Sequence, residues 1–340
     1  MVRPPPAGLG TFLAALLALT ACGDDGPGDP GSTESSSADD VPAVDVEPAE
    51  VVPESTWSNG TIEIAYADGL TAMSGAVYVK TDDGHVVRVD AASGEVTADV
   101  RVDTASDDDH YCLGIGSDGD TLWACSAGDR TTDLVRLDPE SLEVLDTVEV
   151  DKVFDQLTLP VVDGAAWVLS GAGAAITRVD TTTAETTTLA LDRSCYQLAV
   201  LSSTIYATCA PTDEVVALDA GTGEVTAEAE VPGAVNVSVG AGSVWVGGSD
   251  GVVRLSPDLQ PQVLYDGLRA GAEGDVVATD DDVWVRQPAG FLFRIDPATD
   301  IVTSQYVHDP PLSGGSVLGT ADGLWATASD DDLVLRIDPD

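Results

Sequence analysis

The chain has 340 residues, and 44% of them are hydrophobic, which is enough to bury the core of one large all-β domain. Its 59 acidic residues against 14 lysines and arginines give a formal net charge of −45. This charge repels phosphate backbones and anionic headgroups, so it excludes nucleic acid as a partner and disfavours docking of the folded domain on lipid. Divalent cations stay open as partners, because Ca²⁺ and Mg²⁺ prefer oxygen ligands.

The first residues have the pattern of an export signal. Arg3 precedes an apolar run over residues 11–19 that is too short to cross a bilayer as a helix. The run leads into Leu-Thr-Ala-Cys at residues 19–22, which resembles the lipobox of bacterial lipoproteins. The resemblance implies a signal peptide over residues 1–21 and a diacylglycerol on Cys22 that anchors the exported protein to a membrane of the cell envelope. An ordinary signal peptide with a chance cysteine is the alternative.

Gly, Pro, Ser, Asp and Glu dominate residues 22–56. Such a segment cannot bury enough apolar surface to offset the entropy lost on ordering, so we expect a disordered acidic tether starting at Cys22. Repulsion among its carboxylates would extend it. The folded domain is expected over residues 57–340.

One phrase recurs from residue 70 onward: an apolar residue, an aromatic, then a small or β-branched residue. Its aromatic residues are Tyr78, Trp123, Trp167, Tyr206, Trp245, Trp284 and Trp325. A second phrase, Arg-apolar-Asp, follows the aromatic in most units, with Ala217 and Ser256 as departures. A period near 40 residues is typical of several repeat folds, so the type of element has to decide between them.

Each repeat contains short runs of Val, Thr, Ile and Leu, bounded by Gly, Asp and Pro, without helical periodicity. This pattern predicts four strands per unit, and seven such units around an axis predict a seven-bladed β-propeller. The seventh unit stops at Asp340 after its third strand, whereas a strand-like run over residues 60–66 precedes the first unit. We therefore expect this N-terminal strand to close the ring in the last blade.

The aromatic phrase and the following Arg-x-Asp-x-x-Ser/Thr-Gly-Glu-Val segment, as at residues 88–96, resemble YVTN-type and quinoprotein-like propeller repeats. The resemblance covers nearly all of residues 60–340. It implies the fold and says little about activity, since one fold serves many functions.

Four cysteines follow Cys22. Cys112 and Cys195 each stand 11 residues before the aromatic of their unit, and Cys125 and Cys209 stand just after it. Both pairs are expected across the hairpin of the first two strands, within reach of a disulfide. Export to an oxidising space favours the bridges Cys112–Cys125 and Cys195–Cys209. Free thiols or metal ligands are the alternatives.

The repeated Arg, Asp and Trp residues occur in almost every unit, which indicates a structural role. The variable residues lie nine positions before each aromatic and form a polar row: Gly69, Gly114, Thr158, Gln197, Asn236, Asp275 and Ser316. Gln197, Asn236 and Asp275, together with nearby Glu273, are the candidate ligand-binding residues at the axis. Their alternative role is to hydrogen-bond strand ends or channel water.

Three histidines fall on one face, which carries the loops between blades and between the second and third strands; we call it the loop face. His85, His110 and His308 belong to blades 1, 2 and 7, with Asp109 beside His110. They are candidate ligands for a divalent metal. Exposed loop histidines without a metal are the alternative, and we expect no other cofactor.

No phosphate-binding loop, nucleophile elbow or HExxH motif is present. The leading hypothesis is a monomeric, non-catalytic binding or scaffold module that contacts an envelope protein or a glycan. The alternative is a hydrolase or a streptogramin lyase-like propeller enzyme using His110, His308 and Asp109. The lyase's catalytic His and Glu cannot be placed residue by residue in this sequence. An accessory lipoprotein that binds a substrate or an ion is a third hypothesis.

Overall fold

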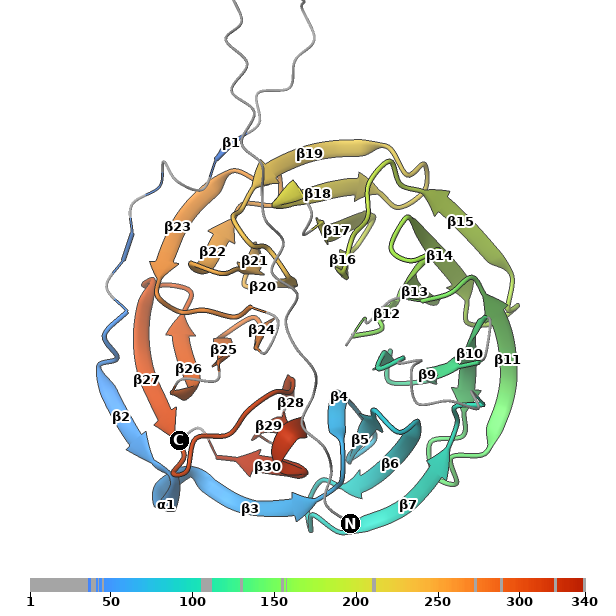
Figure 1. The fold of residues 1–340 in the computed structure, drawn as a ribbon, viewed down its shortest axis with the longest axis horizontal. Helices are drawn as coiled ribbons and strands as arrows, with labels where there is room; N and C mark the ends of the chain where they lie inside the picture. The colour runs from blue at the N-terminus through green and yellow to red at the C-terminus, as the bar shows by residue number, and fades with distance from the viewer. Residues whose placement is uncertain are drawn as a thin grey trace, which may run out of the picture. The chain divides into compact units, whose positions relative to one another are not determined.

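Seven antiparallel sheets surround a common axis in the computed structural model (Figure 1). The structure describes residues 36–37, 41, 43–44, 46–104, 112–128, 131–153, 156, 158–209, 212–271, 274–287, 290–320 and 323–338. Each sheet supplies four strands to a blade, so the predicted seven-bladed β-propeller is confirmed. In the described residues, no helix is long and apolar enough to cross a membrane.

Strands within a blade are given from the axis outward. Blade 1 is β4 (Ala67–Met73), β5 (Ala76–Thr81), β6 (His85–Asp90) and β7 (Val96–Arg101). Blade 2 is β8 (Ile115–Ser117), β9 (Leu122–Ala127), β10 (Thr132–Leu137) and β11 (Val144–Val150). Blade 3 is β12 (Val161–Val162), β13 (Ala165–Ser170), β14 (Ala175–Asp180) and β15 (Thr186–Ala190). Blade 4 is β16 (Gln197–Leu201), β17 (Thr204–Cys209), β18 (Glu214–Asp219) and β19 (Val225–Glu230).

Blade 5 is β20 (Asn236–Gly240), β21 (Ser243–Gly247), β22 (Gly251–Leu255) and β23 (Pro261–Asp266). Blade 6 is β24 (Asp275–Ala278), β25 (Val283–Gln287), β26 (Phe291–Asp296) and β27 (Ile301–Val307). Blade 7 is β28 (Val317–Thr320), β29 (Gly323–Ala328), β30 (Leu333–Ile337) and β3 (Ser58–Glu63). A short 3₁₀ turn, η3 (Ser329–Asp331), joins β29 to β30.

The core lies between the blades. Every residue of the second strands β5, β9, β13, β21 and β25 is buried, because both faces of each sheet pack against neighbouring blades. The outer strand β7, in contrast, has no fully buried residue. This gradient explains the recurring aromatic phrase, which occupies the second strand where the packing is deepest.

The N-terminal strand closes the ring as predicted. β3 pairs antiparallel with β30, with Thr61 opposite Leu335 and Glu63 opposite Leu333 (Figure 1). The first described part of the domain and its last strand therefore belong to one blade, which leaves the sheet no open seam at this point.

The segment before β3 departs from the expected tether. β2 (Glu50–Pro53) adds a parallel strand to the outer edge of blade 6, and α1 (Glu54–Trp57) follows it. Ahead of these, Ala43 bridges to Leu264 of blade 5, and β1 (Ser36–Ser37) pairs with β19 of blade 4. The prediction of disorder as far as residue 56 is therefore wrong for this rim segment, which we define as residues 43–57 where described. The predicted signal peptide and Cys22, the predicted lipidation site, lie outside the described residues.

Trp57 fastens the rim segment. Its side chain is 1% exposed, stacks on Phe291 at 5.2 Å between ring centroids, and donates from Nε1 to the Val307 carbonyl at 3.2 Å. Backbone pairing along a free strand edge needs no particular side chains, so a polar segment can dock in this way once one aromatic anchor is buried.

Three of the repeated arginines link neighbouring blades. Arg88 Nε of blade 1 donates to the Pro139 carbonyl of blade 2 at 3.0 Å, and Arg254 Nη1 of blade 5 reaches the Pro297 carbonyl of blade 6 at 2.9 Å. Arg336 of blade 7 makes the same contact with Ala92 of blade 1 at 2.8 Å. In blades 1, 5 and 7 these bonds fasten the third strand to the outer turn of the next blade.

The repeated aspartates cap the turn between the third and fourth strands. Asp138 Oδ1 accepts hydrogen bonds from the amide and hydroxyl of Ser141 at 2.8 and 2.9 Å, and these bonds lower the pKa of Asp138. The same cap recurs at Asp90, Asp180, Asp219 and Asp296. Such caps satisfy turn amides that no strand partner reaches.

Both predicted disulfides are present, Cys112–Cys125 and Cys195–Cys209, with Cα atoms 5.6 and 3.9 Å apart. Cys112 and Cys195 precede β8 and β16 instead of lying on them. The bridges therefore tie a loop that enters a blade to that blade's second strand.

Candidate functional site

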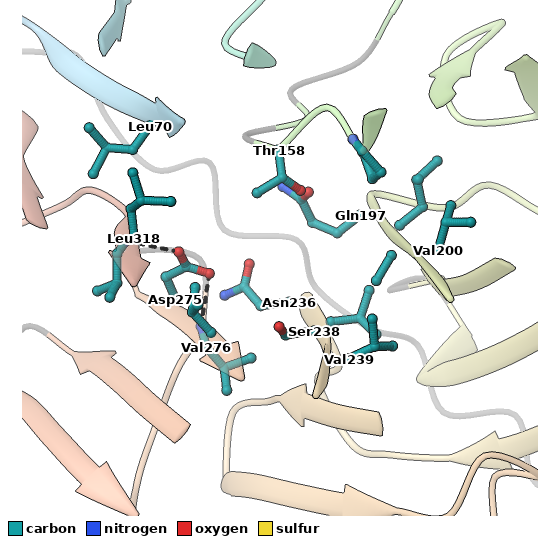
Figure 2. A pocket seen from close by; sticks show the side chains of 16 residues that line it. Leu70, Thr158, Gln197, Val200, Asn236, Ser238, Val239, Asp275, Val276 and Leu318 are labelled. Atoms are coloured by element: carbon teal, nitrogen blue, oxygen red, sulfur yellow. Dashed lines mark hydrogen bonds between the residues drawn. The ribbon is translucent and has the colours of Figure 1, made fainter. Parts of the chain in front are cut away.

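An axial pocket of about 260 Å³ opens between the innermost strands, and Figure 2 shows the side chains that line it. It is lined mainly by β16, β20, β24 and β28, with Leu70 of blade 1 and Thr158 of blade 3 completing the wall. Its size is near the lower end of ordinary small-molecule sites.

The structure brings together the three predicted ligand-binding residues that it describes. Gln197, Asn236 and Asp275 are the first residues of β16, β20 and β24, so consecutive blades place their side chains at one level around the axis. All three line the axial pocket, and each is at least nine-tenths buried (Figure 2). Thr158 of the polar row also lines it, whereas Glu273 lies outside the described residues.

Asn236 uses its amide nitrogen to fix the loop that enters blade 6. Nδ2 donates to the carbonyls of Ala270, Gly271 and Gly274 at 3.0, 3.2 and 2.8 Å. These three contacts orient the side-chain amide. Its oxygen accepts no hydrogen bond from the described residues and is left for the pocket.

Asp275 is held by backbone amides. Oδ1 accepts from Val276 N at 2.8 Å, and Oδ2 accepts from Val317 N of the next blade at 3.0 Å. Burial raises the pKa of Asp275 to about 7, because these two hydrogen bonds lower the pKa by less than burial raises it. The carboxyl thus joins blade 6 to blade 7 and keeps free lone pairs.

Arg286 stands opposite Asp275 in the β24–β25 ladder and was missed by the sequence analysis. Its side chain is fully buried and points its guanidinium at carbonyls: Nη1 donates to Gln287 at 2.9 Å, and Nη2 donates to Gly314 at 3.0 Å. Burial lowers the pKa of Arg286 to about 10. The repeated arginines stand on the third strand of a unit. Arg286 differs from them because it lies two residues after Trp284, inside the buried second strand.

A buried ion pair in blade 1 was also missed. Lys80 is fully buried in β5, and its Nζ lies 3.0 Å from Asp103 Oδ1, which also accepts from the Ala127 amide at 3.1 Å. The pair ties blade 1 to the loop leading into blade 2. Desolvation lowers the pKa of Lys80 despite the adjacent carboxylate.

The described histidines bind separate carboxylates. His85 Nδ1 lies 2.7 Å from Asp99 of the neighbouring strand, while His308 Nε2 lies 3.4 Å from Glu54 of the rim segment. His110 and Asp109 lie outside the described residues. Where the structure describes the chain, no three His, Cys, Asp or Glu side chains are grouped as metal ligands, so it does not bring His85 and His308 into one metal site.

Neither a protein-family model nor a curated protein matches this sequence. Among solved structures it is similar to BamB from Moraxella catarrhalis, with a TM-score of 0.57 and 15% identity, over 82% of this chain and 98% of that one. It is also similar to the β-propeller domain of Myceliophteria thermophila Cps50 (Swd1), with a TM-score of 0.64 and 11% identity, over 83% and 99%. The Neurospora crassa Pan2 WD40 domain gives a TM-score of 0.66 and 11% identity, over 86% and 98%. At these identities the likeness supports the propeller fold alone.

Proposed function

We propose that this protein is an exported lipoprotein whose propeller is a non-catalytic binding or scaffold module at the bacterial cell envelope. The lipid on Cys22 would hold it to the membrane, and the loop face would contact a partner protein. The YVTN-like repeat and the similarity to propellers such as BamB and WD40 domains support a binding role by analogy of fold.

The observation that carries the proposal is a network of contacts between successive loops on the loop face of blades 2 to 4. Thr104 N donates to Ala127 O at 2.9 Å, Ala172 N to Lys152 O at 3.1 Å, and Ser194 Oγ to Ala172 O at 3.1 Å. The two disulfides lie on the same side, at the entrances to β8 and β16. Backbone positions that are fixed in advance lose less entropy on binding, so the described residues of these loops favour a docking platform.

The rim segment is consistent with this role. Its described residues follow the outer edges of blades 5 and 6, and β1 follows the edge of blade 4, so these contacts cover neither face of the ring (Figure 1).

Photo-crosslinking in cells tests the platform. A benzophenone amino acid replaces Lys152, which is exposed on the loop face between blades 2 and 3, or Glu140, which is exposed on the opposite face of blade 2. We expect a specific protein adduct from position 152 and none from position 140. Adducts from position 140 alone would contradict the proposal. The absence of protein adducts at both positions would also contradict it, and a glycan adduct in that case would identify a glycan as the partner.

Metabolic labelling with a fatty acid tests the anchor. The wild-type protein should incorporate label and sediment with membranes, while Cys22→Ser should lose the label and be released. An unlabelled wild-type protein would rule out the lipid anchor without bearing on the loop face.

A further inference from the structure

The axial pocket presents polar groups that the fold itself leaves unused. Gln197 is 6% exposed, lines the pocket, and its side-chain amide makes no hydrogen bond with the described residues. The polar atoms of this amide are therefore free to bind water or a ligand in the pocket. Figure 2 shows this amide, Asn236 and Asp275 around one space. The unsatisfied oxygens of Gln197 and Asn236 are both acceptors.

Asp275 adds a carboxylate that makes no direct ion pair, although the charge of Arg286 in the neighbouring strand lowers its pKa in part. No Lys, Arg or His nitrogen of the described residues lies within ion-pair distance of it, and the nearby Arg286 directs its guanidinium nitrogens at four backbone carbonyls. Asp275 is the only titratable side chain among the described residues that line the pocket. A buried carboxylate of this kind is stabilised by any cation that can reach its free lone pairs.

The rest of the wall decides which kind of cation fits. Leu70, Val200, Val239, Val276 and Leu318 surround the polar groups with apolar surface (Figure 2). A metal ion such as Ca²⁺ needs six to eight oxygen ligands, which a largely apolar wall does not supply. An organic cation can instead cover the wall with its carbon chain while its N–H groups meet the acceptors.

The charge of the whole protein favours the same ligand class. A formal net charge of −45 creates a negative potential that concentrates cations near the surface and accelerates their entry into a cleft with low-dielectric walls. Thr158 lines the pocket and is exposed, so the wall of the pocket reaches the protein surface beside blade 3.

We propose that the axial pocket binds a primary ammonium group on a short apolar chain, with Asp275 as its countercharge and Gln197 and Asn236 as hydrogen-bond acceptors. The ammonium group can belong to a free amine or to a lysine side chain of a partner. This site goes beyond the proposed envelope function and does not depend on the lipid anchor or on the loop platform.

Calorimetric titration of the detergent-solubilised full-length protein tests the site. The probes are n-pentylammonium, 1-pentanol and pentanoate, which share a chain length and differ in charge, together with Nα-acetyl-lysine methylamide. We expect n-pentylammonium to bind at least tenfold more tightly than the alcohol, and pentanoate not to bind. Tighter binding of the lysine derivative than of the free amine would identify a lysine side chain as the source, and weaker binding would identify a small-molecule amine.

Variants separate the site from general electrostatics. Asp275→Asn should remove the preference for n-pentylammonium, and Gln197→Leu should weaken its binding. The matched control Asp281→Asn removes the same charge from an exposed turn of blade 6 and should leave binding unchanged. If Asp275→Asn does not fold, wild-type binding measured between pH 8 and pH 5 replaces it, because protonation of Asp275 should weaken the complex at least tenfold. Equal binding of amine and alcohol, no binding of the amine, or an equal effect of Asp281→Asn would overturn the proposal.

Discussion

Asp275 couples the stability of the ring to pH. Its pKa rises from 3.8 to about 7 on folding, so the folded state prefers the protonated form. The stabilising contribution of the protonated carboxyl is complete below pH 3.8 and is lost as the pH rises through 7. The difference between the two pKa values corresponds to up to about 4 kcal/mol in the free energy of unfolding.

Asp275→Asn removes this titration. We therefore predict that the free energy of unfolding of the wild type, relative to the variant, falls by up to about 4 kcal/mol between pH 4 and pH 8. Urea unfolding of both proteins across this range measures it. The other carboxylates are present in both proteins, so their effects on stability cancel in the comparison. A difference that does not change with pH would show that Asp275 is not the group responsible.

Tyr206 replaces a missing arginine. Blade 4 has Ala217 in the position of the repeated Arg, and Tyr206 Oη donates to the Pro257 carbonyl of blade 5 at 3.0 Å. In blade 1, Tyr78 Oη makes the corresponding bond to Pro139 at 2.8 Å, but Arg88 Nε reaches the same carbonyl.

Tyr206→Phe leaves the Pro257 carbonyl without this donor, so we predict a loss of about 1–2 kcal/mol in the free energy of unfolding. Tyr78→Phe is the matched control and should cost less, since Arg88 still satisfies Pro139. Chemical denaturation at pH 7 compares the two. A larger loss for Tyr78→Phe would be inconsistent with the compensating role of Tyr206.

At the scale of elements, Trp57 decides whether the rim segment stays on blade 6. Replacing this buried ring with alanine removes its stacking on Phe291 and the bond to Val307, which predicts a loss of about 3–5 kcal/mol. Hydrogen exchange should also rise in β2 and β3. Val51→Ala, at a position that is 57% exposed on β2, should change little. Unchanged protection of β2 in Trp57→Ala would mean that backbone pairing alone holds the segment.

The two disulfides also stabilise individual elements. Each closes a short loop, of 13 or 14 residues, so the chain-entropy model gives about 3 kcal/mol per bridge at most. Cys195→Ser with Cys209→Ser should lower the free energy of unfolding by up to that amount and raise exchange at the entrance to β16. Stability equal to that of the oxidised wild type would show that the bridge adds nothing measurable.

The elements also show which features a sequence can predict. The seven blades were predictable because the aromatic, Arg and Asp positions recur in nearly every unit. The rim segment was not, because edge pairing uses backbone groups and its Pro- and Glu-rich composition is typical of disorder. In the site, Gln197, Asn236 and Asp275 were found from their shared register. Arg286 and Lys80 occur once each, so no repeated pattern marks them.

On the scale of the whole molecule, the axial pocket and the loop contacts depend on one closed ring of seven blades. The axial pocket exists because inner strands from consecutive blades meet at the axis, and the loop contacts of blades 2 to 4 form between described residues that the ring holds side by side. Both arrangements require that the last blade be completed by β3, a strand from the other end of the chain.

The most direct test of the closed ring is a cysteine pair at the junction. Glu63 of β3 and Leu333 of β30 are register partners, so Glu63→Cys with Leu333→Cys should form a disulfide in the folded protein. Peptide mapping without reduction should then find the segment around residue 63 joined to the one around residue 333. A fold that leaves the two new thiols free, or links residue 63 to a different blade, would contradict the closed seven-bladed ring.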